Sequence, residues 1–559
     1  MACRQPLQPM DVTTLKGVLA EWRPALLPSR FEKAQQPRSQ TIQLALRSLE
    51  GVHWLELSWQ PEAARVHRIE PPPRLGQGST LAQQLQHGLR GLALVEIRQS
   101  GWERVVELGF ALRPGEPVAR WLVAELMGRH SNLLLLDGQR SVVALARQVK
   151  ESQSRLRPIA TGDPYCSPPP LAGEPPRLTE SRTSWQQRLC LLPLPLGKAL
   201  LHTYQGVSPA LLGQLLDAGQ AELPAQGLDA AAWERLWQRW GRWLEAVEQG
   251  RFGWQAQGDG YRCWCSAPAG PDGDGWALNR AIAGYYGRRL AQRRLQDQQL
   301  RLRQLLLAAI ERERCRQAEQ RALLDATGDS DALQQRADGL LSQMAPSRHC
   351  VEEAQRLYRR ARKLRRSVAV IQRRLELHRQ RRDALEASLT YLEQADAPDS
   401  LDALALDIDA LLGARRRVGR GEGPAVERGV PHPLELRTPG GLMVQVGRNH
   451  RQNEWISLRQ ARHGDLWFHA QELPGSHVVL KASAAIPADA DLQLAADLAA
   501  HFSRGRGSGR VPVVMVPALE LQRIPAAAPG TVRHRGGTVL WGEPERATAA
   551  LAGAPSLRR

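Results

Sequence analysis

Residues 356–382 read RLYRRARKLRRSVAVIQRRLELHRQRR, and the organisation of the rest of the chain follows from this stretch. A set of mostly aliphatic positions recurs in it at alternating intervals of four and three residues. Side chains with that period form a seam that faces a partner helix on every turn. The stretch therefore predicts one strand of a coiled coil. Its seam positions are Leu364, Val368, Ile371, Leu375, His378, Arg382, Leu385, Leu389 and Leu392.

The segment before this helix can serve as its partner. The aliphatic positions of that segment are Leu295, Leu302, Leu306 and Ile310. Residues that favour a reversal of the chain separate the two segments, namely Thr327, Gly328, Asp329, Ser330, Asp331 and Gly339. We therefore expect a long antiparallel coiled coil, over residues 285–395, within one chain rather than a seam between two chains. The protein is accordingly expected to act as a monomer.

The charge of the coiled-coil segment indicates its partner. From Arg356 to Arg382 there are twelve Arg or Lys residues and one acid, so the segment supplies +11 (twelve minus one) of the net charge of +18. A solvated coiled coil ordinarily alternates charge signs, so one sign implies a polyanion; a merely soluble basic face is the alternative. The absence of Trp and Phe disfavours a membrane surface. The predicted contacts with nucleic acid are Arg359, Arg360, Arg362, Lys363, Arg365 and Arg366.

Composition and motifs exclude several classes of protein. A chain of 559 residues is long enough for roughly three or more folding units. Its seven cysteines are scattered, with no CxxC pair, so neither a zinc site nor a disulfide framework is expected. There is no phosphate-binding loop, dinucleotide fingerprint or nucleophile elbow. We therefore expect a protein without catalytic residues, cofactor or metal. Since it has no long apolar run and no secretory signal, a cytoplasmic location off the membrane is expected.

Residues 1–157 are predicted to form an α+β domain that is rich in sheet. Helices are predicted at 81–92 and 122–127. Alternating or short apolar runs predict strands at 41–46, 53–59, 95–99, 105–110 and 133–136. Glu103 and Arg104 lie between two of these strands, beside a Trp102 that is expected to be exposed. They form either a surface ion pair of little worth or a donor and acceptor pair for a nucleotide.

A second candidate group in this domain is Arg129, His130 and Asn132, which follow the helix predicted at 122–127. Cationic side chains suit a helix C-terminus, so these residues either cap the helix or bind nucleic acid. Residues 177–250 are predicted to be helical, with Gly206-Val207-Ser208-Pro209 between two short helices. That turn fits a helix-hairpin-helix or any other corner between helices. The stripe Trp233, Trp237, Trp240 and Trp243 predicts a buried helix face.

The remaining regions are a middle domain (251–412), a linker (413–433), a second α+β domain (434–545) and a tail (546–559). Polar residues gather at the strand ends of the second α+β domain, where binding residues are commonly found. These residues either contact RNA or merely cap helices and turns, with Trp467 in the core. The candidates are Arg448, Asn449, Gln452, Asn453, Asp465, Trp467, His469, Ser476 and His477.

The same residues closely resemble the RNA-binding domain of the NFACT family, which includes bacterial ribosome quality-control factors and proteins described as fibronectin-binding. The motifs are Val446-Gly447-Arg448-Asn449, Gln452-Asn453, Asp465-Leu466-Trp467-Phe468-His469 and Pro474-Gly475-Ser476-His477. Earlier motifs follow in the family's order: Gln99-x-Gly101-x-Glu103-Arg104, Glu125-Leu126-Met127-Gly128-Arg129-His130-Ser131-Asn132, Gly206-Val207-Ser208-Pro209 and the basic run that ends at Arg366. The resemblance implies a multidomain α+β fold with a glycosylase-like N-terminal domain, a helix-hairpin-helix module, a coiled coil and a C-terminal NFACT-R domain.

The resemblance also implies a function. Members of the bacterial branch bind a large ribosomal subunit that is obstructed by a stalled nascent chain on tRNA. They recruit alanyl-tRNA, and the ribosome then appends alanines without mRNA. By this resemblance Glu103, Arg104, Arg129, His130 and Asn132 would bind tRNA, and the polar residues of 434–545 would bind RNA. Glycosylase chemistry is not implied, because Ala2-Cys3 stands where that class needs an N-terminal proline.

The sequence departs from the family pattern at three places. The family's Asp-Arg pair is Glu103-Arg104 here, the preceding basic helix end reads Gln86-His87-Gly88, and a late Lys-Lys pair is replaced near Gln522-Arg523. An RNA-binding ribosome factor that has lost tailing is therefore one alternative. A surface adhesin for fibronectin or fibrinogen is another, although the missing export signal disfavours it.

Overall fold

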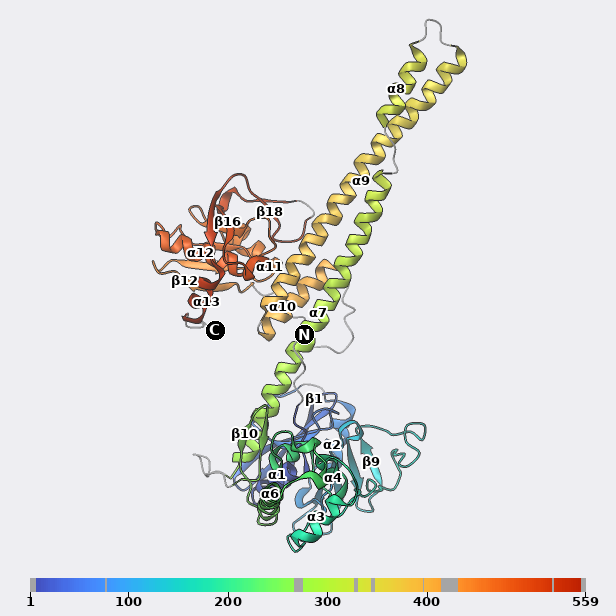
Figure 1. Ribbon diagram of the computed structural model, residues 1–559, viewed down its shortest axis with the longest axis vertical. Helices are drawn as coiled ribbons and strands as arrows, with labels where there is room; N and C mark the ends of the chain where they lie inside the picture. The colour runs from blue at the N-terminus through green and yellow to red at the C-terminus, as the bar shows by residue number, and fades with distance from the viewer. Residues whose placement is uncertain are drawn as a thin grey trace. The chain divides into compact units, whose positions relative to one another are not determined.

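A computed structural model of the chain describes residues 7–75, 78–265, 275–325, 330–342, 347–395, 397–413, 431–524 and 527–553 (Figure 1). The chain divides into two compact units, Met1–Ala291 and Gln292–Arg559. The boundary lies inside helix α7 (Ala277–Asp325), so the first turns of α7 belong to the first unit. Most of the predicted linker, residues 414–430, lies outside the described residues. None of the described helices has the length and apolar character needed to cross a membrane.

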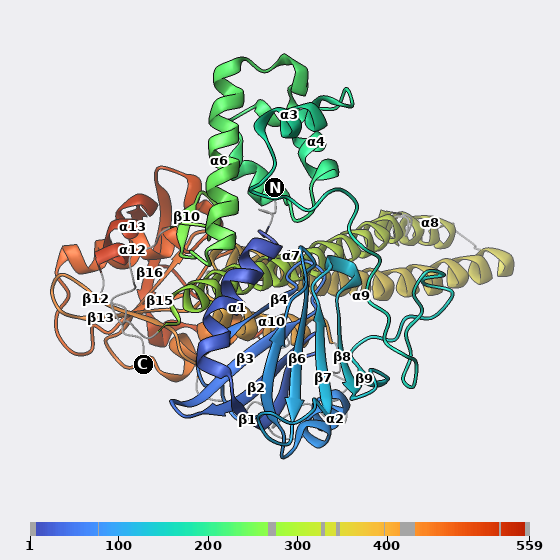
Figure 2. The same ribbon diagram turned by 90° about the horizontal axis from the view of Figure 1, so that it is seen from below.

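A nine-stranded antiparallel sheet forms the centre of the first unit (Figure 2). Its strand order is β4-β3-β2-β1-β5-β6-β7-β8-β9, and the five strands predicted from the sequence are all present. The strands are β1 (Ser29–Arg38), β2 (Thr41–Ser48), β3 (Gly51–Ser58), β4 (Arg65–Ile69), β5 (Ala93–Arg98), β6 (Val105–Ala111), β7 (Arg120–Glu125), β8 (Asn132–Asp137) and β9 (Val142–Leu145).

The helix predicted at 122–127 is wrong, because this segment belongs to strand β7. Leu122 pairs with Leu108 of β6 and with Leu135 of β8. Both faces of the sheet are covered here, and the residues from Trp121 to Leu126 are all buried. A strand buried on both faces gives a continuous apolar run instead of alternation, and such a run cannot be distinguished from a buried helix by periodicity.

Two helices cover one face of the sheet. Helix α1 (Val12–Leu26) is capped by Asp11, whose carboxylate accepts a hydrogen bond from the Thr14 amide at 2.9 Å. Leu15, Leu19 and Trp22 of α1 are buried against the sheet, together with Leu85 of helix α2 (Thr80–Leu89). Their side chains recur at helical spacing, so each helix buries one face in the same core.

Four helices pack into a second, smaller core of the first unit: α3 (Arg182–Cys190), α4 (Leu196–Thr203), α5 (Pro209–Leu215) and α6 (Ala230–Glu248). The prediction that the tryptophan stripe is a core face is confirmed, since Trp233, Trp240 and Trp243 are buried and Trp237 packs against them. Trp185 of α3 contacts three of these rings at centroid distances of 5.2–5.7 Å.

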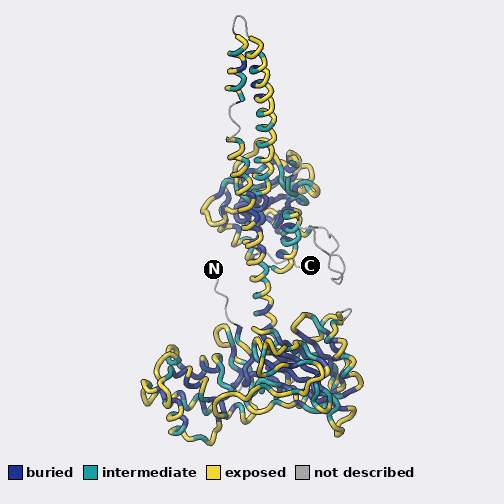
Figure 3. Tube along the Cα trace, turned by 90° about the vertical axis from the view of Figure 1, so that its right-hand side faces the viewer, coloured by how far each residue is buried: buried dark blue, intermediate teal, exposed yellow. Residues whose placement is uncertain are grey.

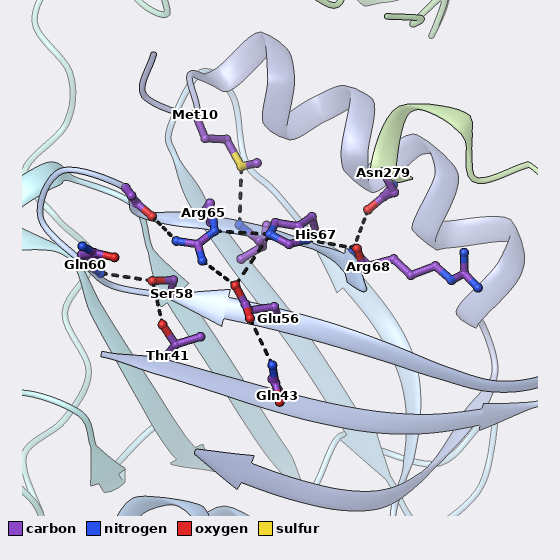
Figure 4. A network of polar contacts seen from close by, with 12 residues as sticks. Met10, Thr41, Gln43, Glu56, Ser58, Gln60, Arg65, His67, Arg68 and Asn279 are labelled. Atoms are coloured by element: carbon purple, nitrogen blue, oxygen red, sulfur yellow. Dashed lines mark hydrogen bonds and ion pairs between the residues drawn. The ribbon is translucent and has the colours of Figure 1, made fainter. Parts of the chain in front are cut away.

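A buried polar network joins the start of α7 to the sheet (Figure 4). The Asn279 side-chain oxygen accepts hydrogen bonds from Trp22 Nε1 at 2.9 Å and from the Arg68 amide at 2.8 Å. Close by, Arg65 is paired with Glu56 and donates through Nε to His67 Nε2 at 3.3 Å. Burial and Arg65 lower the pKa of His67 to about 4, so a neutral His67 donates through Nδ1 to the Arg68 carbonyl. Beside this network, β10 (Gln255–Gln257) and β11 (Gly260–Arg262) form a hairpin.

Long helices open the second unit: α7 from Gln292 onward, α8 (Ser330–Leu341), α9 (Arg348–Gln394) and α10 (Pro398–Leu411). Leu306 of α7, Leu385 of α9 and Leu404 of α10 share one apolar cluster. Later residues of α7 meet earlier residues of α9, so the two helices run antiparallel; Gln299 bonds the Ala395 carbonyl (2.7 Å) and Glu313 contacts His378 (2.6 Å). All nine predicted seam positions are buried or half-buried (Figure 3).

A six-stranded sheet of order β12-β13-β15-β14-β16-β19 forms the C-terminal domain of the second unit. Helix α12 (Asp489–His501) covers one face, and α11 (His450–Glu454) and the π-helical turn Trp455–Arg459 lie at the other. Helix α13 (Pro544–Gly553) packs on α12, so the tail expected at 546–559 is helical up to Gly553. The strands are β12 (Leu434–Arg437), β13 (Met443–Val446), β14 (Leu466–Ala470), β15 (Val478–Leu480), β16 (Val511–Pro517) and β19 (Thr538–Gly542), with a separate pair β17 (Gln522–Arg523) and β18 (Val532–Arg533).

Candidate nucleic-acid interface

Helix α9 presents a row of cationic side chains on the face opposite its seam. Seven exposed residues share this face, and in the described part of the chain no carboxylate oxygen lies within 4.0 Å of their charged nitrogens. The row extends from residue 359 to residue 381, a rise of about 33 Å at about 1.5 Å per residue. We call these residues the α9 basic row: Arg359, Arg362, Lys363, Arg366, Arg373, Arg374 and Arg381. Of the other predicted contacts, Arg360 is exposed and Arg365 is paired with Asp331 of α8 at 3.0 Å.

Two predicted binding loops of the first unit lie side by side at one end of the nine-stranded sheet. Val105, where β6 begins, pairs with Glu125, where β7 ends, and Glu125 also pairs with Asn132, where β8 begins. The Leu126 amide donates to the Arg104 carbonyl at 2.9 Å. The register of three strands therefore brings the connection 99–104 next to the turn 126–131.

Within this pair of loops, Glu103 and Arg104 are used differently. The Glu103 carboxylate accepts a hydrogen bond from the Leu171 amide at 3.1 Å, and its carbonyl accepts one from Gln99 Nε2 at 2.7 Å. The half-buried Arg104 has no carboxylate within 4.0 Å among the residues that the structure describes, and it forms no ion pair with Glu103. Glu103 is thus anchored, whereas no hydrogen bond from the Arg104 guanidinium to another described residue is found.

Trp102 connects these loops to the turn between helices α4 and α5. Its ring is half-buried, not exposed as expected, and lies 5.4 Å from the Trp243 ring. Lys16 Nζ lies 5.2 Å from the same ring. Gly206, with φ of 77°, approaches Trp102 so closely that a Cβ atom would overlap the indole. The turn therefore packs directly against the residue before Glu103.

The turn after β7 separates Arg129 and His130 from Asn132. Arg129 and His130 are exposed, and Arg129 Nε donates to His130 Nε2 at 3.0 Å. Asn132 is buried, and its side chain bonds the Arg147 carbonyl at 2.8 Å and the Leu133 and Arg147 amides at 3.0 Å. Asn132 therefore fastens the chain after β9 to β8. The helix cap considered for this segment is wrong, because a strand precedes it.

In the C-terminal domain, several predicted RNA-binding residues act as caps and turn supports. The buried Asn449 accepts from the Gln452 amide at 2.8 Å, and Gln452 Oε1 accepts from the Arg448 amide at 2.8 Å. Asp465 accepts from Lys481 Nζ at 3.1 Å and from Ser483 Oγ at 2.6 Å. Their polar groups are thus used within the domain, as the capping alternative expects.

Other predicted residues join this domain to the long helices. Asn453 donates to Tyr391 Oη of α9 at 2.8 Å and accepts from the His477 amide at 3.2 Å, while Tyr391 Oη donates to the Gly475 carbonyl at 3.0 Å. His450 Nε2 lies 3.0 Å from Ser388 Oγ of α9. The Arg451 amide donates to Asp407 of α10 at 3.2 Å. The polar cluster is therefore the joint between the domain and α9–α10.

Of the aromatic members of the cluster, Trp467 and His477 are buried and His469 is half-buried. Trp467 is buried, stacks on His469 at a centroid distance of 5.5 Å and meets the His477 ring edge-on at 5.0 Å. Burial lowers the pKa of His469 to about 4 and holds the pKa of His477 well below its usual range, so both rings are neutral. Ser476 is also fully buried. Of the nine predicted residues, only Arg448 and His469 are partly accessible.

The helix residues of this joint are not among the predicted seam positions of α9. Ala384, Ser388 and Tyr391 are buried and recur at intervals of four and three residues beside that seam. A second stripe with the same period indicates a second packing partner. That stripe is the signal that would have located the joint in the sequence.

Comparisons with known proteins agree with this organisation. Residues 11–345 and 343–417 match the NFACT N-terminal and middle domains, and residues 434–536 match the NFACT protein RNA binding domain. The chain is 26% identical to a protein named Rqc2 homolog RqcH of Streptococcus pneumoniae (strain D39), over 94% of this chain and 96% of the relative. It is 23% identical to the protein of the same name in Bacillus subtilis (strain 168), over 93% and 95%.

Among solved structures, the C-terminal part of the fibronectin/fibrinogen-binding protein of Streptococcus suis is 26% identical, with a TM-score of 0.41. That match covers 46% of this chain and 99% of the solved one. The family assignment follows from the domain matches alone. Because the match to the N-terminal and middle domains extends over more than half of the sequence, this chain belongs to the NFACT family.

Proposed function

We propose that this NFACT protein is a ribosome-associated quality-control factor, which binds large ribosomal subunits obstructed by a stalled nascent chain on tRNA. The observation that carries the proposal is the α9 basic row, seven exposed cations without carboxylate partners in the described part of the chain. Ribosomal RNA presents a dense array of phosphates, and release of their counterions favours such a surface. The match to an RNA-binding domain and the relatives named Rqc2 homolog RqcH support the same partner.

The tRNA would be held by the loops at the end of the nine-stranded sheet. Arg104, Arg129 and His130 supply donors there, and a guanidinium can present two parallel N–H groups to a phosphate. Glu103 would act by holding the segment around Leu171, to which it is bonded at 3.1 Å. We propose that the tRNA is alanyl-tRNA and that it supports non-templated alanine tailing of the nascent chain for degradation. Peptidyl transfer itself would be carried out by the ribosome, so the protein positions substrates and is no enzyme.

Charge reversal in the α9 basic row tests the ribosome proposal. The variant R359E/R362E/K363E is expected to co-sediment less with large subunits, and the logarithmic salt dependence of binding should lose about two to three units of slope. The matched control is R301E/R303E/R312E, which reverses three exposed charges on α7. If both triple variants bind alike, with the wild-type slope, the row does not contact RNA and the proposal loses its main support.

A separate experiment tests the tRNA step. Wild-type protein would be incubated with large subunits that carry peptidyl-tRNA and then recovered, so that the bound tRNA can be sequenced and the nascent chain weighed. R104E is expected to retain subunit binding and to lose tRNA, whereas the exposed control R113E should retain both. If wild-type protein binds subunits without tRNA or added alanine, the chain is a ribosome factor that lacks tailing.

A further inference from the structure

One corner of the C-terminal sheet, on the face away from α12, carries exposed apolar side chains. The register places Pro512 of β16 opposite Trp541 of β19, and in the next row His469, Val514 and Val539 lie across β14, β16 and β19. Successive residues of a strand point to opposite faces, and Leu540 between the two exposed residues packs into the core with α12. Trp541 is 56% exposed and Val539 is 46% exposed. We call His469, Pro512, Val539 and Trp541 the Trp541 surface.

An exposed tryptophan on an edge strand requires an explanation. Tryptophan carries a large apolar area and is ordinarily mostly buried. The backbone of Trp541 is held firmly, since its carbonyl accepts from Gln493 Nε2 of α12 at 2.8 Å and it pairs with Pro512. The indole is therefore displayed by a rigid strand and not by a loop. An aromatic face fixed in this way is suited to stack on another flat ring.

Among the described residues, unpaired cations stand at the end of the Trp541 surface where β19 begins. Arg533 and Arg535, just before β19, are exposed and have no carboxylate within 4.0 Å among the described residues. Arg506 is likewise exposed and unpaired among the described residues, but its neighbour Gly505 lies against Val511, whose side chain is in the core with α12, so Arg506 is not counted with this surface. Arg510 is paired with Glu543 at 3.0 Å. The acids near Arg510 are Glu543 and the exposed Glu472, so the net positive charge of this surface comes from Arg533 and Arg535.

We propose that the Trp541 surface binds single-stranded RNA. Trp541 stacks on one base, and Arg533 and Arg535 contact phosphates of the same strand. Stacking on an aromatic ring in a basic groove is how proteins hold single strands without reading their sequence, and a base-paired strand cannot offer a free face to the ring. The inference rests on the proposed function for its partner, RNA. It places the stacking ring of Trp541 beyond the matched segment 434–536, whereas the motif residues Trp467 and His477 are buried.

The test measures binding of the full-length protein to a fluorescently labelled uridine strand of about 12 nucleotides, by anisotropy. W541A is expected to weaken this binding by about 5- to 100-fold, whereas W541F, which keeps a stacking ring, should stay within about threefold of wild type. The matched control is L519A, which truncates another side chain of the domain that is 60% exposed. L519A should bind as wild type, and a blunt RNA duplex of the same length should bind W541A and wild type equally.

The arginines give a second readout. Because stacking releases no counterions, W541A should leave the salt slope unchanged, whereas R533E/R535E should lower it by about one to two units. Equal binding of the single strand by W541A and wild type overturns the inference. So does a W541A variant that keeps RNA binding but loses self-association, since the surface would then be a protein interface. If wild-type protein binds large subunits but not the single strand, this inference is wrong and the proposed function stands. If wild-type protein binds neither, the proposed function is wrong as well.

Discussion

Asn453 is a motif residue whose side chain forms hydrogen bonds within the protein. Its side chain is buried and satisfies both Tyr391 Oη and the His477 amide, at 2.8 and 3.2 Å. We predict that N453A lowers the free energy of unfolding of the second unit by about 2–4 kcal/mol, because two buried polar groups lose their partner. Urea denaturation would measure this, with the exposed Q460A as control. A change below about 0.5 kcal/mol would show that the joint tolerates the loss.

Asp407 gives the joint a dependence on pH. Burial raises the pKa of this carboxyl from 3.8 to about 6, although hydrogen bonds and the charge of Arg451 partly oppose the rise. Between these two values the folded state binds more protons than the unfolded state, so the contribution of Asp407 to stability falls as the pH rises.

The variant D407N removes this titration. We predict that the stability of wild type relative to D407N falls by roughly 2–3 kcal/mol between about pH 4 and about pH 7. Unfolding of both proteins would be followed at several pH values, and contributions of other groups cancel in the difference. A difference that does not vary with pH would mean that Asp407 is ionised throughout.

At the residue scale, the sequence could not separate binding residues from capping residues. Asn449, Asp465 and Ser476 lie in turns, and a cap requires the same oxygen acceptors as a contact with a hydroxyl or an amide. Only burial distinguishes the two roles, and burial is set by strands that come from distant parts of the chain. Arg104 and the α9 basic row remain predictions for binding, because their charged groups are left unpaired in the described residues.

At the scale of elements, Gly206 links the turn between α4 and α5 to the candidate tRNA loops. Its φ of 77° and the overlap of a Cβ atom with Trp102 both oppose a side chain. We predict that G206A destabilises the first unit by at least about 2 kcal/mol. G213A, in helix α5 with nothing near its Cβ position, should be neutral or stabilise by up to about 1 kcal/mol. Thermal unfolding of both variants checks the pair; equal effects would contradict it.

Two adjacent leucines of α7 test the packing of the long helices. Leu306 is fully buried with α9 and α10, whereas Leu307 is 47% exposed. We predict that L306A costs about 2–5 kcal/mol in unfolding free energy, since it leaves a cavity, and that L307A costs less than about 0.5 kcal/mol. Chemical denaturation followed by circular dichroism would measure both. Similar losses would mean that α7 does not pack through the observed face.

The sequence pattern of α9 predicted its seam, because side chains on one face of a helix recur at regular intervals. The prediction of a short helix at 122–127 was wrong. In β7 the apolar residues are contiguous, because both faces of the strand are covered. Residues that precede β7 in the chain cover one face, and residues that follow it cover the other. Periodicity reports how many faces an element buries, not which element lies over them. The same limit hid the second stripe of α9.

At the scale of the whole molecule, the chain has two units with separate cores. Leu55 is fully buried in the core of the first unit, and Leu498 is fully buried in the C-terminal core of the second. We predict that L55A lowers the unfolding temperature of one calorimetric transition and L498A that of another. If each substitution shifts the entire profile, the units unfold as one through helix α7.

The sequence by itself determined the long helices with their cationic face, most strands, the tryptophan core and the family, because each depends on local periodicity, charge or short motifs. Only the tertiary structure decided which polar residues are available. It buried the C-terminal motif in a joint with Tyr391 and Asp407, and it left Arg104, the α9 basic row and Trp541 accessible. The physical reason is that solvent exposure and hydrogen-bond partners come from segments far apart in the chain, which the spacing of residues does not encode.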